Sequence, residues 1–117
     1  MKKINILKEN DEYNRIIRNY KPIKYNDYII YIEKNTNEVY KFGFSVGKKI
    51  GHAVLRNKIK RQLKSILDKI PFKNNFKCII IVKKGIIDKS FIEMENDLKI
   101  ALKKINIIKE SIDEKNI

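Results

Sequence analysis

Cysteine, histidine, tryptophan and proline are scarce in this sequence. Its 117 residues include one cysteine, one histidine, two prolines and no tryptophan. The lone Cys78 excludes a disulfide within the chain and, because it lies in an apolar run, is interpreted as a small buried side chain in a reducing cytoplasm. The lone His52 has no cluster of cysteine, histidine or carboxylate around it. We therefore predict no metal site and assign His52 to the start of a helix.

Long apolar runs and catalytic patterns are missing as well. No segment approaches the roughly 18 apolar residues of a membrane span, and the amino terminus lacks the continuous apolar core of a signal peptide. The sequence contains no GxxxxGK[ST] phosphate-binding loop, no nucleophile–base triad and no pair of carboxylates in its most basic segment. It therefore predicts a cytoplasmic protein that has no catalytic residue of its own and no contact with a membrane.

Positive charge is what the sequence has in excess. Lysine and arginine number 27 against 14 aspartates and glutamates, which leaves a formal net charge of +13. The excess is concentrated, because residues 41–64 hold eight lysines and arginines and no acidic residue. So dense a patch favours a nucleic acid as partner. The alternative is a solvated basic face that only keeps the protein soluble.

The length and the 43% hydrophobic content predict one folded domain over residues 1–117, with fraying after about residue 110. Asn10 is expected to cap a first helix, whose apolar positions have helical spacing and which Pro22 ends. A second helix is predicted over residues 52–70. Ser90 and Glu93 form the signature of a capping box, which predicts a third helix running to Ile105.

Three extended segments are predicted between these helices. Residues 25–33 and 38–46 flank a turn-prone stretch at 35–37, so they are expected to form a hairpin. Residues 76–83 contain an apolar run that is typical of a central strand buried on both faces. In the segment 38–46, alternation places Lys41, Gly43 and Ser45 on the face away from the core. The order of elements predicts an α/β fold, an α+β sandwich of helices on a mixed sheet.

The basic segment combines a turn with an amphipathic helix. Gly47 and Gly51 are expected to turn the chain sharply and expose backbone N–H groups, with Lys48 and Lys49 just before a helix amino terminus that favours anions. Along the helix, cationic side chains recur every four residues opposite an apolar stripe. Such a helix can lie along a phosphate backbone.

These residues resemble a known family. The glycine–lysine turn followed by Ala53-Val54-x-Arg56-Asn57-x-x-Lys60-Arg61 is similar to the signature of the bacterial ribonuclease P protein component. The stretches 7–17 and 28–32 resemble its first helix and first long strand. The resemblance implies a subunit of an RNA–protein enzyme that removes the 5′ leader of precursor tRNA, with the chemistry performed by RNA and Mg²⁺. It also implies a left-handed strand–helix–strand crossover, an exception to the usual hand.

Carried over by position, the resemblance implies two binding sites, with no catalytic and no metal-binding residue. The catalytic RNA would be bound by the turn and the helix after it, at Lys48, Lys49, Arg56, Asn57, Lys58, Lys60, Arg61 and Lys64. The single-stranded leader would lie in a cleft between the first helix and the sheet, lined by Tyr13, Ile17, Tyr31, Lys41 and Ser45. Mg²⁺ would belong to the assembled enzyme and be held mainly by the RNA.

The sequence departs from the family pattern at several of these positions. Lys58 and Lys64 stand where arginine is usual, which keeps the charge but loses the bidentate fork. Ile17 replaces a frequent aromatic residue, and His52 a frequent asparagine. The alternative for Tyr13, Ile17 and Tyr31 is ordinary packing in the core.

Two other functions are compatible with the charge alone. One is a ribosomal or other structural RNA-binding protein. The other is a DNA-binding regulator, which would need a second helix after residue 70 to complete a helix-turn-helix, whereas residues 73–83 are predicted as loop and strand. Both treat the arginine–asparagine signature as a coincidence.

Overall fold

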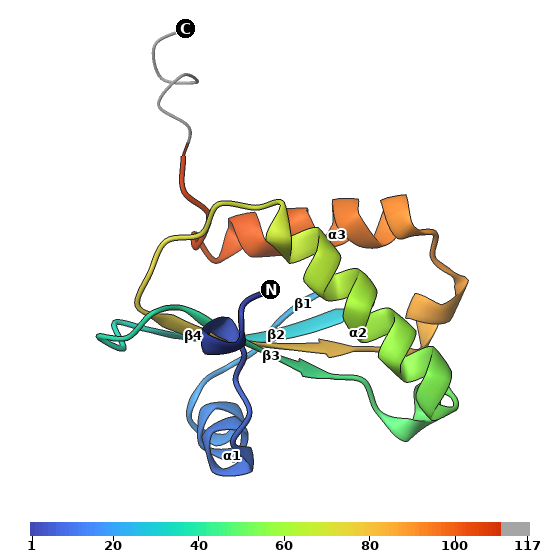
Figure 1. The fold of residues 1–117 in the computed structure, drawn as a ribbon, viewed down its shortest axis with the longest axis horizontal. Coiled ribbons are helices and arrows are strands. Elements are labelled where there is room, and N and C mark those ends of the chain that lie inside the picture. The colour runs from blue at the N-terminus through green and yellow to red at the C-terminus, as the bar shows by residue number, and fades with distance from the viewer. Residues whose placement is uncertain (111–117) are drawn as a thin grey trace, which may run out of the picture.

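The computed structural model describes residues 1–110, and the fraying predicted after about residue 110 lies outside the described residues. The chain forms three layers, in which α1 covers one face of a four-stranded sheet and α2 and α3 cover the other (Figure 1). The helices are α1 (Asn10–Asn19), α2 (Ala53–Asp68) and α3 (Phe91–Lys104), and the strands are β1 (Ile23–Tyr25), β2 (Tyr28–Lys34), β3 (Lys41–Ser45) and β4 (Phe76–Val82). Short 3-10 turns are η1 (Lys3–Asn5), η2 (Lys48–Ile50) and η3 (Lys84–Asp88).

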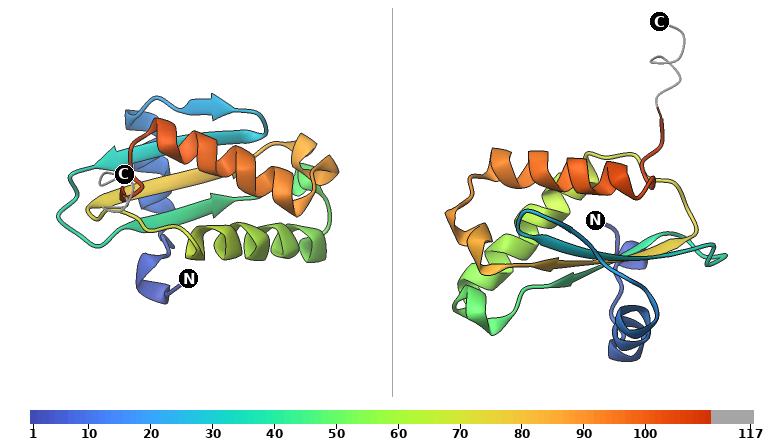
Figure 2. Two further views of the ribbon diagram at one scale, coloured as in Figure 1. Left: turned by 90° about the horizontal axis from the view of Figure 1, so that it is seen from above. Right: turned by 180° about the vertical axis from the view of Figure 1, so that it is seen from behind.

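The sheet is mixed, with the strand order β1-β2-β4-β3. β4 runs antiparallel to β2 and parallel to β3, so α2 is the helix of a strand–helix–strand crossover. With α2 toward the viewer (Figure 2, left), β3 and β4 both run to the right and the chain steps from the lower strand to the upper one. The crossover is therefore left-handed, as the family resemblance implied.

The predicted hairpin of residues 25–33 and 38–46 is wrong. β4 lies between β2 and β3, and the hairpin is formed instead by β1 and β2, which turn at Asn26 with a φ of 49°. The reason is burial, because β4 is apolar on both faces and is stabilised by having a strand on each side. The turn at 35–37 is confirmed, since Asn35 and Asn37 both have left-handed φ angles, but it carries the chain past β4 to β3 rather than into a hairpin.

The helix starts differ from each other in how they are capped. Asn10 is the first residue of α1 and not its cap, because the first helical bond runs from Tyr13 N–H to Glu9 O; Glu9 is the N-cap residue and makes no side-chain cap. The capping box of α3 is confirmed in both directions, since Ser90 Oγ accepts from Glu93 N–H and Glu93 accepts from Ser90 N–H, each at 3.1 Å.

Each face of the sheet has its own core. The larger core, between the sheet and α2 with α3, includes Phe42, Leu63 and Cys78, whose thiol has its pKa raised by complete burial. The smaller core lies under α1 and consists of Leu7, Ile16 and Ile79 with partly buried neighbours. α1 is short and covers only part of this face. The rest of the face stays accessible, with Ile29 and Ile81 only partly buried.

Candidate nucleic-acid interface

The solvent face of α2 carries the predicted basic residues. Ile59, Leu63, Ile66 and Leu67 are buried against the sheet, which turns the opposite side of the helix outward. Asn57, Lys58 and Arg61 are exposed at the centre of that outward side, and Lys60 and Lys64 lie partly exposed at its flank. Val54, in the same exposed line, is 81% exposed. The helix therefore presents a convex cationic surface.

Arg56 has a more local role than its place in the pattern suggested. Its side chain is partly buried, and its Nε donates to Gly51 O at 3.1 Å. The guanidinium thus ties the first turn of α2 to the preceding loop, while its charge stays at the edge of the cationic surface. This contact was not predicted from the helical spacing.

The loop before α2 is held by one buried anchor and one special glycine. Ile50 is buried, whereas Lys48 and Lys49 beside it are exposed. Gly51 has a φ of 152°, which favours glycine, and a Cβ there would stand 2.9 Å from Leu55 Cδ2. The chain also turns at Gly47, whose carbonyl accepts from Ile50 N–H at 3.1 Å, but its φ of −72° does not require glycine and a Cβ would meet nothing within 4 Å. His52 is the N-cap residue of α2, as predicted.

The cations of η2 and α2 form no ion pairs within residues 1–110, and Asp68 at the end of α2 pairs with the amino group of Met1. None of the lysines and arginines predicted to bind the catalytic RNA takes part in an ion pair there. Like charges held close together without counter-charges repel one another and attract a polyanion. We refer to Lys48, Lys49, Arg56, Lys58, Lys60, Arg61 and Lys64 as the α2 surface.

A groove lies on the opposite side of the sheet, between α1 and β3. Its volume is about 490 Å³, and it is lined by Asn10, Tyr13, Asn14, Ile17, Phe44 and Ser45. The Tyr13 ring rests on Gly43, where a Cβ would come within 2.9 Å of Tyr13 Cε1, and its hydroxyl donates to Leu7 O at 3.3 Å. Burial raises the pKa of Tyr13. Ile17 is 36% exposed, so an apolar wall faces the solvent.

The five predicted leader residues do not all meet in this groove. Tyr13, Ile17 and Ser45 line it together. Tyr31 is partly buried and packs against the smaller core, with Ile79 directly opposite it on β4. Lys41 lines a neighbouring hollow of about 290 Å³ together with Glu12, Glu38 and Lys77.

An ion-pair network fills that neighbouring end of the α1 face. Lys77 Nζ donates to Glu12 Oε1 at 2.6 Å and lies 3.4 Å from Glu38 Oε2, which in turn is 3.8 Å from Lys41 Nζ. Arg15 links α1 to β2, with Nε donating to Glu12 and Nη2 to Glu33 Oε1, each at 2.8 Å. Six side chains form the network: Glu12, Arg15, Glu33, Glu38, Lys41 and Lys77.

The network shifts the acidity of its carboxyl groups. The hydrogen bond from Arg15, followed by that from Lys77, lowers the pKa of Glu12 to about 2. The hydrogen bond from Arg15 is also the main cause that lowers the pKa of Glu33. The cations of this end are therefore already neutralised by carboxylates.

Sequence reasoning missed two of the groove residues, Asn10 and Asn14. The signal was present in the helical spacing, because residues 10, 14 and 17 share one side of a helix that holds Tyr13 against the sheet. Their amides add hydrogen-bonding groups beside the aromatic ring.

In residues 1–110 no group of three or more histidine, cysteine, aspartate or glutamate side chains is arranged to hold a metal ion. No helix in this part of the chain is long and apolar enough to cross a membrane.

A cationic helix face and an open groove with an aromatic wall, built on the two sides of one sheet, define an RNA-binding α+β domain. The family model for ribonuclease P matches residues 1–106. The chain belongs to the ribonuclease P protein family, whose members are the accessory protein subunit of an RNA-based endoribonuclease that processes tRNA.

The individual proteins to which this chain is similar are also named as ribonuclease P proteins. The ribonuclease P protein component of Mycoplasma mobile is 36% identical over 113 residues, covering 96% of this chain and 99% of the relative. That of Mycoplasma capricolum is 45% identical over 87 residues, covering 74% and 75%. The solved Staphylococcus aureus RNase P protein has a TM-score of 0.81 at 27% identity, covering 92% of this chain and all of that one. The Thermotoga maritima protein, at 24% identity and a TM-score of 0.74, covering 84% and 94%, has the same fold.

Proposed function

We propose that this chain acts in the cytoplasm and binds two RNAs at once, the ribonuclease P RNA through the α2 surface and the 5′ leader of precursor tRNA through the groove beside α1. The observation that supports the first contact is the set of cations on η2 and α2 without acidic partners among the described residues. The backbone of a folded RNA supplies the counter-charge that the protein lacks.

The groove has the properties that a single-stranded leader requires. Tyr13 offers a partly buried ring and Ile17 an apolar wall, and stacking of a base on an aromatic side chain is worth about 1–3 kcal/mol whatever the base. A leader site must accept many sequences, so contact through base faces fits the task. Tyr31 and Lys41 belong to this proposal as neighbours of the groove, beneath and beside α1.

The chemistry of leader removal is assigned to the RNA and its Mg²⁺ ions. The protein would contribute by shielding repulsion between phosphates, which lowers the Mg²⁺ concentration that the RNA needs. We expect no tightly bound metal on the protein itself.

Cleavage of precursor tRNA at low Mg²⁺, by the cognate RNA with and without protein, tests this function. The expected result is cleavage at the mature 5′ end only when the RNA is present, with a lower Mg²⁺ requirement when protein is added. Correctly placed cleavage by protein freed of all RNA would contradict the assignment. Sequencing the RNAs that co-purify with the protein separates this function from a ribosomal one.

A further inference from the structure

The α1 side of the sheet carries a row of side chains that α1 leaves partly uncovered. The strand registers place Lys24, Ile29, Ile81 and Ser45 side by side across β1, β2, β4 and β3. Alternation puts this row on the α1 side, because Tyr28, Ile30 and Ile80 belong to the core on the other side. Ile29 and Ile81 are only partly buried, and α1 is the one helix on this side within residues 1–110 (Figures 1 and 2).

The row continues the groove. Ser45 lines the groove beside Tyr13 and Ile17 and is also the end of the row on β3. From Ser45 to Lys24 the row crosses three strand spacings of about 4.8 Å, which is about 14 Å. That length is comparable to about four bases stacked at about 3.4 Å. A strand of RNA leaving the groove along the sheet would meet Ile81, then Ile29, then Lys24.

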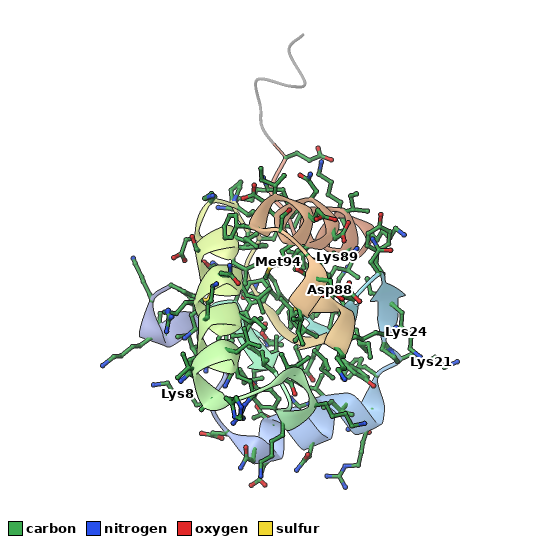
Figure 3. All side chains as sticks on the ribbon, turned by 90° about the vertical axis from the view of Figure 1, so that its right-hand side faces the viewer. Lys8, Lys21, Lys24, Asp88, Lys89 and Met94 are labelled. Carbon is green, nitrogen blue, oxygen red and sulfur yellow. The ribbon has the colours of Figure 1, made fainter. Side chains whose placement is uncertain are left out.

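Two lysines without ion-pair partners among the described residues flank this apolar floor. Lys24 is exposed on β1, at the edge of the sheet, where it lies close to Lys21 (Figure 3). Lys83 follows Ile81 by two residues in extended conformation, with φ −89° and ψ 163°, so its side chain leaves the same face of the sheet. At the other end of the α1 face the situation is reversed, because Lys41 and Lys77 are paired with Glu38 and Glu12.

We infer that Lys24 and Lys83 bind phosphates of the leader strand, whose bases lie over Ile81 and Ile29. This inference rests on the proposed leader site and extends it from the groove across the sheet to β1. An apolar floor takes the faces of bases without reading their edges, and the lysines at its borders neutralise the backbone that runs beside them. The leader would thus leave the groove away from the ion-pair network, whose cations are already paired with carboxylates.

The test is the affinity of the reconstituted enzyme for precursor tRNAs whose leader is shortened one nucleotide at a time, with mature tRNA as the baseline. The double variant Lys24→Ala/Lys83→Ala should bind long leaders less tightly, by up to about fivefold for each lysine. It should match the unmodified enzyme on mature tRNA and on leaders too short to leave the groove. The dependence of affinity on salt should flatten by about 0.7 in log–log slope for each phosphate that is no longer bound. Lys103→Ala/Lys109→Ala, two exposed lysines in and after α3, is the matched control.

The outcomes separate this inference from the function on which it rests. If the unmodified enzyme shows no preference for a leader, the leader site itself is wrong and the extension falls with it. If the preference exists but the Lys24/Lys83 variant keeps it in full at every leader length, only the extension is overturned. An equal loss on precursor and mature tRNA would also overturn it, because the lysines would then contact the catalytic RNA or the body of the tRNA.

Discussion

The cations of the α2 surface and those beneath α1 are in opposite electrostatic states. On α2, Lys58 and Arg61 are exposed without an acidic partner in the described chain, whereas Lys77 on β4 and Arg15 on α1 are held by carboxylates at 2.6–2.8 Å. The cations of the first set repel one another, a repulsion that a bound polyanion would relieve, whereas the ion pairs of the second set stabilise the fold. The proposed contact with the catalytic RNA therefore rests on the cations whose counter-charge is missing, and not on the total positive charge of the chain.

The largest effect should come from reversing charge on the α2 surface. Lys58→Glu/Arg61→Glu replaces two exposed cations on the outward side of α2, and removing each charge-assisted hydrogen bond to RNA should cost about 1–3 kcal/mol of binding. Titration of the catalytic RNA with the variant at fixed salt should show affinity weakened by a factor of about 30 or more. Circular dichroism and the free energy of unfolding should stay unchanged, since neither side chain packs in a core.

The control for this variant is Lys103→Glu/Lys109→Glu, which changes the net charge equally on the side of α3. If control and variant lose the same affinity, binding follows total charge and the α2 surface has no special place. Arg56 is left intact in both, because its bond to Gly51 O would mix a structural effect with weaker RNA binding.

Removing a carboxylate from the ion-pair network should lower the stability of the fold and leave RNA binding unchanged, the opposite of the effect on the α2 surface. Glu33→Gln removes the carboxylate that accepts from Arg15 and from Tyr20, and should lower the free energy of unfolding at pH 7 by about 1–2 kcal/mol. Affinity for the catalytic RNA should not change. Urea denaturation and RNA titration of the same preparation measure both quantities.

The same network predicts how stability depends on pH. The pKa values of Glu12 and Glu33 are lowered in the folded protein, so both carboxylates stabilise the fold above their ordinary pKa of 4.5. This stabilisation is lost as pH falls from 4.5 towards about 2, the pKa of Glu12. Between pH 7 and pH 3 the Glu33→Gln variant should therefore lose less stability than the unmodified protein. Equal losses would mean that Glu33 is not paired in solution.

The α2 surface could be predicted from the sequence because it depends on local spacing. Cations recur every four residues opposite Ile59 and Leu63, and both sides of that pattern belong to one helix. The network could not be predicted, because Glu12 and Lys77 are 65 residues apart and meet only through the fold. At the sequence level, Glu12 reads as an acidic residue near a helix start, and Lys41 as a free charge.

The strand order could not be predicted from local sequence patterns either, because it depends on contacts between segments that are distant in the sequence. Turn signals at residues 35–37 are real, but they do not say which strand pairs with β2. That choice is made by burial of β4 between β2 and β3. The left-handed crossover likewise came from the resemblance to a family, since the general rule for such units predicts the other hand.

A smaller effect should separate the groove from the α2 surface. Gly43→Ala places a methyl group where the Tyr13 ring now rests, so the ring must shift and stability should fall by about 1 kcal/mol. The reconstituted enzyme should lose part of its preference for precursor over mature tRNA while it assembles normally with the catalytic RNA. Tyr13→Phe, which keeps the ring and removes only the 3.3 Å bond to Leu7 O, should keep that preference. A Gly43→Ala enzyme with full preference would remove Tyr13 from the leader site.

The smallest expected effect concerns the two glycines that flank η2, and it asks whether the α2 surface has a fixed geometry. Gly47 has a φ of −72° and open space around it, so Gly47→Ala should leave the fold unstrained. It should stabilise the fold by about 0.4–1 kcal/mol, because alanine lowers the conformational entropy of the unfolded chain. Gly51 has a φ of 152° and Leu55 beside it, so Gly51→Ala should instead destabilise by about 1 kcal/mol or more and displace Lys48 and Lys49 relative to α2. If the two lysines and the helix bind RNA as one rigid surface, Gly51→Ala should also weaken assembly, whereas Gly47→Ala should not. Equal RNA affinity for both variants, measured where both are fully folded, would mean that the loop adapts to the RNA and that only the helix presents a preformed site.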